Sequence, residues 1–274
     1  MDTEAVTPLA PREVGRTVFT QTWAELTFLH WSVEPERVAA YLPPGVRPDT
    51  FDGKTYVGLV PFRMQDIGLL SSPGVPYFGT FLETNVRLYS VDEQGRRGVV
   101  FVSLDAERLV PILVARAAKL PYVWSSMRYE RDGARITYRC VRRPLLKRLS
   151  SSRTVTRAGI STAQNTATST ISVTVGDPVP AEEVTDLEHW MTARWGLHQS
   201  GYYWPNAHET WPLHRAELDH FDDQILSAAG FAELTARTPD SVLFSPGVHA
   251  VFGPGSARDG KSGTHHRLKK SDAG

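Results

Sequence analysis

The sequence has a single cysteine, no long apolar segment and no net charge, and each of these absences narrows what the protein can be. Cys140 alone cannot form an internal disulfide, which fits a reducing, cytoplasmic compartment. No run of about 18 apolar residues occurs, so we expect no membrane-spanning helix. Thirty basic residues balance 30 acidic ones, so no overall field attracts nucleic acid or an anionic membrane. The N-terminal residues lack an apolar core, and we expect no signal peptide.

Lysine is also scarce, which restricts any chemistry that needs an amine. Only six of the 30 basic residues are lysines. A lysine that attacks a carbonyl must be neutral, and therefore buried or next to another cation. Lys54 lies in a predicted turn, Lys147 lies in an arginine-rich stretch, and three lysines lie near the C-terminus. Lys119 is the remaining candidate, although it also suits the basic end of a predicted helix.

The segment from Phe81 to Tyr89 predicts a β-strand with a polar face. Strand side chains alternate between faces, so Glu83, Asn85 and Arg87 project to one side. The opposite side carries residues that suit a core. An acid, an amide and a base on one face are either solvated or line a polar cavity. Because the neighbouring strands are strongly apolar, we favour the cavity, and with it small-molecule binding or chemistry.

Hydrophobic patterning predicts a mainly β (α+β) protein, more barrel than sandwich, with a few helices. Strands are expected over residues 17–31, 55–64, 81–89, 98–104, 122–130, 134–142, 169–175, 201–204, 211–218 and 241–252. Helices are expected over residues 33–41, with Ser32 as the N-cap, and over 105–120, 181–196 and 222–229. Residues 142–157 read as a basic, solvated surface loop.

The domain organisation is expected to be simple. Residues 1–15 predict a flexible N-terminal arm, and residues 16–252 a single domain of β-barrel type. Residues 253–274 are polar and rich in glycine, serine and lysine, and predict a disordered C-terminal tail.

Several short motifs together resemble the YqjF-like (DUF2071) family of uncharacterised bacterial proteins. The order and spacing match for Leu29-His30-Trp31, Leu42-Pro43-Pro44-Gly45, Thr55 to Met64, Glu83-x-Asn85-x-Arg87, Ser103 to Ala106, Trp211-Pro212-Leu213 and Ser245 to Val248. The likeness covers roughly residues 20 to 252. This family is more distantly similar to the acetoacetate decarboxylase superfamily. The resemblance implies an acetoacetate decarboxylase-like closed β-barrel with a deep internal pocket and a few flanking helices.

The resemblance carries over to the site only in part. In the decarboxylases a pocket lysine forms a Schiff base with a β-keto acid, a second lysine lowers its pKa, and a glutamate assists. Glu83 matches the pocket glutamate in order and in distance to Leu104-Asp105. The paired lysines follow a proline after a helix, a place that Tyr122 and Val123 occupy here. The resemblance therefore supports the fold and the pocket, and not the reaction.

A hypothesis for the site follows from the polar strand. Arg87 or Arg63 holds a carboxylate through paired hydrogen bonds, Glu83 acts as acid and base, and Asn85 orients a carbonyl. In the alternative, Glu83 and Arg87 form structural ion pairs with partners across the sheet, Arg63 among them. On the next hairpin strand Tyr122 and Trp124 alternate. Tyr122 either donates to an oxyanion or is a core aromatic residue, and Trp124 is assigned to substrate binding.

Other site classes lack support in the sequence. The histidines between residues 189 and 220 lack the spacing of a metal site, and no phosphate-binding loop or esterase motif occurs. No metal, cofactor or nucleic acid is therefore expected. The expected ligand is a small organic acid or carbonyl compound. The protein is expected either to bind this compound or to act on it by lyase- or isomerase-type acid/base chemistry without a Schiff base. A non-catalytic ligand-binding or sensor protein and a Schiff-base decarboxylase using Lys119 remain alternatives. The superfamily resemblance also allows a homo-oligomer.

Overall fold

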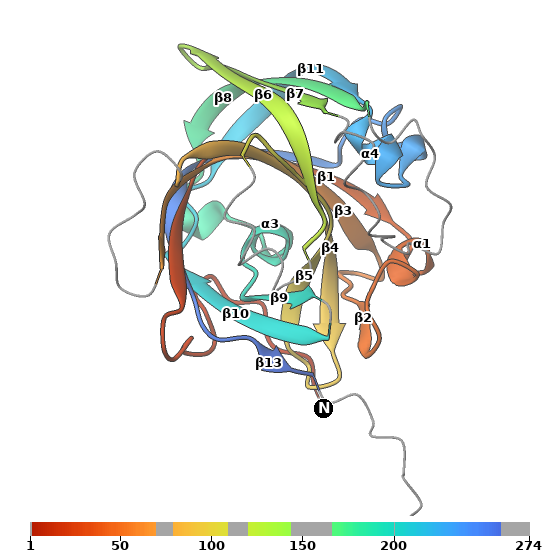
Figure 1. Ribbon diagram of the computed structural model, residues 1–274, viewed down its shortest axis with the longest axis vertical. Coiled ribbons are helices and arrows are strands. Elements are labelled where there is room, and N and C mark those ends of the chain that lie inside the picture. The colour runs from red at the N-terminus through yellow and green to blue at the C-terminus, as the bar shows by residue number, and fades with distance from the viewer. Residues whose placement is uncertain (1, 70–78, 109–119, 144–165, 200, 259–274) are drawn as a thin grey trace, which may run out of the picture.

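The computed structural model describes residues 2–69, 79–108, 120–143, 166–199 and 201–258 (Figure 1). Strands dominate these residues, as the alternating patterns predicted. The long strands are β1 (Phe19–Val33), β3 (Thr55–Leu69), β4 (Phe81–Asp92), β5 (Arg97–Ala106), β6 (Tyr122–Asp132), β7 (Arg135–Arg142), β8 (Thr168–Pro178), β10 (Tyr202–His208), β11 (His214–Asp223) and β12 (Ser241–Phe252). Shorter strands are β2 (Val46–Pro48), β9 (Gly196–Gln199) and β13 (Ser256–Ala257).

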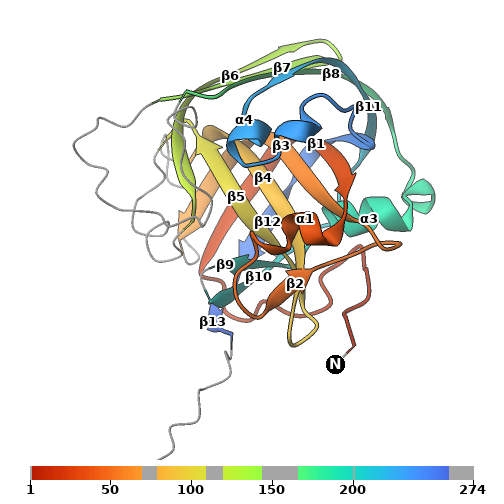
Figure 2. The same ribbon diagram turned by 90° about the vertical axis from the view of Figure 1, so that its right-hand side faces the viewer.

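All of these strands belong to one sheet. Its order is β13-β10-β9-β5-β6-β7-β8-β11-β12-β1-β3-β4-β2, and β10–β12 and β5–β4 pair in addition. Because these two pairings join strands that are distant in the order, the sheet folds back on itself. Figures 1 and 2 both show β6, β7, β8 and β11 at one end of the molecule and β10 and β13 at the other.

The helices are few and short. They are α1 (Pro35–Ala39), α3 (Asp186–Thr192) and α4 (Ile225–Ala228), with 3-10 turns at Ala181–Glu183 and Ala232–Leu234. Within the described residues, none has the length and apolar character needed to span a membrane.

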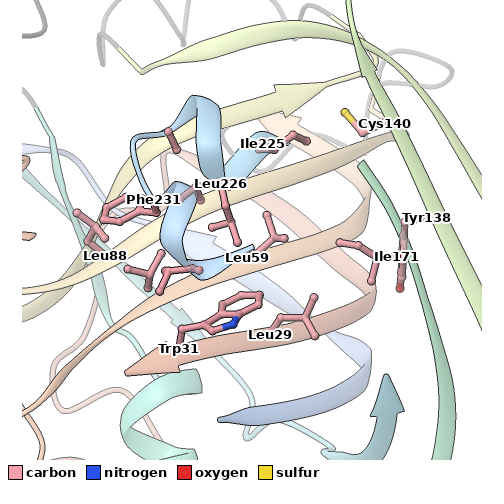
Figure 3. Close-up of a cluster of buried hydrophobic side chains, with 14 of the residues drawn as sticks. Leu29, Trp31, Leu59, Leu88, Tyr138, Cys140, Ile171, Ile225, Leu226 and Phe231 are labelled. Atoms are coloured by element: carbon pink, nitrogen blue, oxygen red, sulfur yellow. The ribbon is translucent and has the colours of Figure 1, made fainter. Parts of the chain in front are cut away.

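Strands β1, β3 and β4 are covered on both faces. On one face, residues from these strands pack against β7, β8 and the region around α4 (Figure 3). Leu29, Leu59, Leu88, Ile171 and Leu226 are no more than 1% exposed there. Each buried side chain of this size contributes about 1.5–3 kcal/mol of transfer free energy. The residues at alternate positions therefore project toward the opposite face, where the site lies.

Strand β12 pairs with β1 and contains the Pro246-Gly247 pair. Gly247 has a φ of 130°, and a Cβ there would lie 2.1 Å from the Trp23 carbonyl oxygen. Glycine is thus required, both for the backbone conformation and for the close approach of the two strands. The adjacent part of β1 is irregular too, because the register with β3 shifts between Ala24 and Leu29.

The structure corrects several predicted boundaries. Ser32 lies within β1, and α1 begins after Glu34, which makes no side-chain capping bond. The helix expected over 181–196 is limited to α3, because Thr185 and Glu188 form a capping box and the chain leaves helical geometry at Ala193. Strand β9 then follows.

Two further boundaries concern the predicted helices at 222–229 and 105–120. Asp222 and Asp223 end β11, and α4 starts at Ile225. Asp105 and Ala106 belong to β5. The rest of the helix predicted over 105–120 lies mostly outside the described residues.

The first residues of the chain contact the sheet. The Glu4 N–H donates to the Gly95 carbonyl at 3.0 Å, and Arg97 Nε donates to the Glu4 carbonyl at 2.7 Å. Trp195 Nε1 donates to the Thr7 carbonyl at 3.3 Å. The flexibility expected for residues 1–15 stays a prediction, as does the division of the chain into arm, domain and tail.

Candidate functional site

A cavity of about 190 Å³ lies inside the folded sheet. Aromatic and aliphatic side chains make up most of its wall: Phe19, Trp23, Leu26, Val60, Phe62, Met64, Ile67, Phe81, Val99, Phe101, Leu104, Leu120, Leu197, Trp211 and Phe252. Its polar side chains are fewer: Gln21, Glu83, Asn85, Arg87, Tyr122, Thr192, Arg194, Asn206 and His208. A mainly apolar cavity with a few converging polar groups is typical of a small-molecule site.

Strand β4 supplies the central polar residues. Glu83, Asn85 and Arg87 line the cavity and are 3%, 5% and 9% exposed. The intervening Val86 packs in the apolar cluster on the opposite face. The period of two therefore determines which side chains reach the cavity, and all three line it.

Glu83 lies beside Tyr122, and we call this pair the acid end of the cavity. The Tyr122 hydroxyl donates to Glu83 Oε2 over a long 3.5 Å. Burial raises the pKa of Glu83 to about 8, the Tyr122 hydrogen bond opposes the rise, and the nearby Asp105 charge adds to it. Burial, with the Glu83 charge, also raises the pKa of Tyr122 well above its usual range. Glu83 is therefore mostly protonated at neutral pH, as is Tyr122.

Arg87 is held in place by neighbours that lie on the side of Arg87 away from Glu83. Its Nε donates to the Tyr89 hydroxyl at 3.1 Å, and its Nη2 donates to the Met191 carbonyl at 3.0 Å. The guanidinium lies 5.2 Å from the centre of the Phe28 ring. A Cβ at Gly58 would lie 3.1 Å from Arg87 Cγ, so the glycine leaves room for the arginine stem. These contacts hold the guanidinium in one position at the cavity wall.

Two further basic side chains lie near Arg87, and we call Arg87, Arg194 and His208 the basic end. Arg194 Nη1 donates to Asp49 Oδ2 at 2.5 Å and its Nε to the Trp190 carbonyl at 2.7 Å. Its Nη2 is buried and has no hydrogen-bond partner among the described residues. Asp49 also pairs with Arg97 at 2.5 Å, so this carboxylate is shared between two arginines.

His208 is neutral at the basic end. Its Nδ1 is 2.6 Å from the Glu209 carbonyl, which can only accept, so Nδ1 carries the proton and Nε2 is an acceptor. Burial lowers the pKa of His208 to about 4, and the Arg87 charge contributes to the same direction. At neutral pH the positive charge of this end therefore belongs to the arginines.

Comparison with known proteins places the chain in a family. The sequence model of the DUF2071 family, described as an uncharacterized conserved protein, matches residues 20–249. The chain belongs to the DUF2071 family. It is 28% identical over 221 residues to the uncharacterized protein YqjF of Bacillus subtilis strain 168, which covers 79% of this chain and 83% of YqjF.

Solved structures show that this DUF2071 protein has an acetoacetate decarboxylase-like fold. An acetoacetate decarboxylase-like enzyme from Sphingomonas wittichii RW1 matches with a TM-score of 0.56 at 10% identity, covering 91% of this chain and 96% of that one. Acetoacetate decarboxylase from Legionella pneumophila matches with a TM-score of 0.55 at 14% identity, covering 91% of this chain and 92% of that one. The enduracididine biosynthesis enzyme MppR complexed with pyruvate matches with a TM-score of 0.53 at 15% identity, covering 88% of this chain and 90% of that one.

Two of the described residues that were assigned to the site from sequence, Arg63 and Trp124, are not among those lining the cavity. Arg63 alternates with Phe62 and Met64, so it faces away, and its guanidinium lies 5.4 Å from the centre of the Tyr129 ring. Trp124 is half-buried, with the Arg143 guanidinium 5.3 Å from its ring centre. These positions give no support to a role of either side chain in binding a ligand inside the cavity. Lys119 lies outside the described residues.

Sequence reasoning missed Arg194, Asn206 and His208. Asn206 and His208 repeat on β10 the alternation that identified β4, although Pro205, directly before them, ended the predicted strand at Trp204. Asn85 Oδ1 and Asn206 Oδ1 are both buried without a hydrogen-bond partner among the described residues. A polar ligand in the cavity would satisfy such groups.

A buried ion pair outside the cavity was also missed. Arg142 Nε donates to Asp105 Oδ1 at 2.7 Å, and its Nη2 donates to Oδ2 at 2.8 Å. Ser103 and Ser125 also hydrogen-bond to this carboxylate. Arg142 is therefore the buried last residue of β7 and does not belong to the basic surface loop predicted over 142–157. Residues 144–157 of that predicted loop lie outside the described part of the chain.

A serine, a histidine and an aspartate also meet at the end of β4, away from the cavity. His198 Nδ1 is 2.9 Å from Ser90 Oγ, and its Nε2 is 3.4 Å from Asp92 Oδ2. Ser90 and His198 are fully buried and do not line the cavity, so a substrate cannot reach the hydroxyl. We assign this group to packing. Over the described ranges, no three His, Cys, Asp or Glu side chains gather in a metal-binding arrangement.

Proposed function

We propose that this DUF2071 protein binds an organic acid in the cavity, with the carboxylate on Arg87. One observation carries this: Arg87 is buried at the cavity wall, and no carboxylate of the described residues forms an ion pair with it. A buried charge without an opposite charge beside it is costly, because the protein interior solvates it poorly. An anionic ligand would offset that cost through charge-assisted hydrogen bonds to the guanidinium.

We further propose that Glu83 is the acid and base of the site. A carboxyl group with a pKa near 8 carries a proton at neutral pH and can release it near that pH, which suits proton transfer. The protonated Glu83 would donate to a carbonyl oxygen of the ligand, and the ionised form would take a proton from the adjacent carbon. Tyr122 would supply a second donor to the same oxygen, and Asn85 a polar contact. The reaction class is then lyase- or isomerase-type.

The fold neighbours support a small-molecule role. Two of them are an acetoacetate decarboxylase and an acetoacetate decarboxylase-like enzyme, and MppR was solved with pyruvate. The pairings β4–β5 and β10–β12 support the closed β-barrel that the sequence resemblance implied, with the cavity inside it. Schiff-base chemistry has no support in the described part of the chain. Its one lysine there, Lys54, is half-exposed and pairs with Glu34.

Replacing Arg87 tests the binding role. We expect Arg87→Met to weaken binding of carboxylic acids such as hexanoate by about 10- to 100-fold, the effect of losing a hydrogen bond to a charged group in a buried site. Isothermal titration calorimetry measures it. Arg63→Met is the matched control, since it removes the same group from β3 outside the cavity, and should leave binding unchanged. Equal loss in both variants, or in neither, would refute the role of Arg87.

Replacing Glu83 tests catalysis separately. In heavy water, the wild type is expected to exchange the hydrogens next to the carbonyl of a bound oxo acid, followed by proton NMR. Glu83→Gln keeps the shape and a hydrogen bond but cannot transfer the proton, so binding should persist and exchange should stop. Oxo acids that bind without exchange or turnover in the wild type would contradict the catalytic role. They would favour the alternative, a ligand-binding or sensor protein.

Borohydride reduction tests the third hypothesis, a decarboxylase using Lys119. Because we propose chemistry without an amine, no covalent adduct should appear by intact-protein mass spectrometry after reduction with β-keto or α-keto acids. An adduct in the wild type that is absent in Lys119→Ala would contradict the proposal and establish a Schiff base.

A further inference from the structure

The polar groups of the cavity form two separate centres. Glu83 and Arg87 are four residues apart on β4, so their Cα atoms lie about 13 Å apart in an extended strand. Their side chains do not close this gap. Glu83 lies beside Tyr122, whereas Arg87 is bonded to Tyr89, which is two residues further from Glu83, and to the carbonyl of Met191. One short molecule therefore cannot contact both groups.

The electrostatic neighbours of each centre agree with this separation. The pKa of Glu83 responds to burial, Tyr122 and Asp105, and Arg87 is not among its causes. The Arg87 charge acts instead on His208 and His30. Burial lowers the pKa of both histidines, and the Arg87 charge contributes to the same direction. The acid end and the basic end are thus electrostatically distinct parts of one cavity.

The wall between the two ends is mostly apolar. Phe62 is opposite Glu83 on β3, and Val60 is opposite Asn85. On β5, Leu104 is opposite Asn85, and Phe101 is opposite Arg87. All four of these neighbours line the cavity. On β4 itself, Asn85 is the one polar side chain between the two ends that does so.

We propose that the ligand is an elongated monocarboxylic acid. Its carboxylate binds at the basic end, an apolar chain crosses the middle of the cavity, and a carbonyl or hydroxyl oxygen meets Glu83 and Tyr122. This inference rests on the proposed function and refines its substrate class. Acids as short as pyruvate would reach only one end at a time.

A chain-length series tests the inference. We expect affinity, measured by calorimetry or by the fluorescence of Trp23 and Trp211 in the cavity wall, to rise from acetate through butyrate and hexanoate to octanoate. Burial of each methylene should tighten binding about fourfold. Equal, Arg87-dependent affinities for butyrate and octanoate would overturn the elongated ligand but leave the proposed function intact. Affinities that Arg87→Met does not change would refute the proposed function itself.

A second comparison locates the far end of the ligand. Octanoate is compared with the same acid carrying a terminal hydroxyl, in the wild type, Glu83→Leu and Arg87→Met. Arg87→Met should weaken both acids alike. Glu83→Leu should weaken only the hydroxylated acid, roughly two- to tenfold, as expected for one lost hydrogen bond. Equal effects of Glu83→Leu on the two acids would overturn the placement of the oxygen at the acid end.

Discussion

A single carboxyl group, Glu83, shows how the environment of a residue determines its chemistry. It is 3% exposed, has one long hydrogen bond from Tyr122, and forms no ion pair with any of the described residues. Asp105 lies on the neighbouring strand, next to Ala106, the residue opposite Glu83. Asp105 is also buried, but it pairs with Arg142 and accepts hydrogen bonds from two serines. Burial without a cation raises the pKa of Glu83, which makes it the group best suited to exchange protons near neutral pH.

The raised pKa of Glu83 predicts a pH dependence of stability. The carboxyl titrates near 4.3 in the unfolded chain and at about 8 when folded. Between these values the folded state holds the Glu83 proton more tightly, so the contribution of Glu83 to the free energy of unfolding falls as pH rises from about 5 to 8. Glu83→Gln removes this contribution, so the stability of the wild type relative to the variant should fall over the same window. Urea unfolding at several pH values measures both proteins, and parallel profiles would contradict the raised pKa.

Helix α3 shows how an element positions the site. It is short, and its first turn is fixed by a capping box in which Thr185 Oγ accepts from the Glu188 N–H at 3.2 Å and Glu188 Oε2 accepts from the Thr185 N–H at 2.8 Å. The last turn supplies the Met191 carbonyl that holds Arg87. Arg194 lies two residues beyond Thr192, the last residue of the helix. The basic end therefore depends on the place where this helix starts and ends.

Removing the cap is expected to affect both stability and binding. Thr185→Ala should lower stability by about 1 kcal/mol, which corresponds to a melting temperature lower by roughly 2–4 °C. Binding of octanoate should weaken, since Met191 and Arg194 lose a fixed position. Thr210→Ala is the control, because Thr210 is also exposed and makes only a 3.5 Å contact. A melting temperature equal to that of the control would show that the cap does not hold the helix.

Elements with a clear period were predictable from sequence, and contacts between distant elements were not. Alternation identified β4 and the three side chains that it turns into the cavity. The pairing of Asp105 with Arg142 depends on β6 lying parallel to β5, at Leu104 opposite Tyr122, and on β7 pairing back with β6. No local pattern encodes that arrangement. For the same reason Arg194, placed by the end of α3, looked like the basic last turn of a longer helix, and Arg63 looked available to the cavity.

At the scale of the whole molecule, the cavity and the main apolar cluster lie on opposite faces of β1, β3 and β4. Figure 3 shows that cluster, with Leu226 and Phe231 near α4 directed at Leu59 and Leu88 of the sheet. This arrangement lets the protein keep a cavity, because tight packing on the other face stabilises the same strands. Stability and ligand binding are therefore expected to be separable by mutation.

A substitution in that cluster tests the separation. Leu226 is fully buried there and lies outside the cavity wall. Leu226→Ala should lower stability by about 2–5 kcal/mol, the usual result of deleting a buried leucine side chain. The affinity of the folded protein for octanoate should stay unchanged below the unfolding transition. A loss of affinity in the folded Leu226→Ala protein would show that the two faces are coupled.

The most direct test of the account is a crystal structure of the protein with octanoate bound. The account predicts the carboxylate oxygens within hydrogen-bond distance of the Arg87 guanidinium, with the chain passing Asn85 between Val60 and Leu104 toward Glu83. A carboxylate bound at Glu83 and Tyr122, or an acid bound outside the cavity, would contradict it.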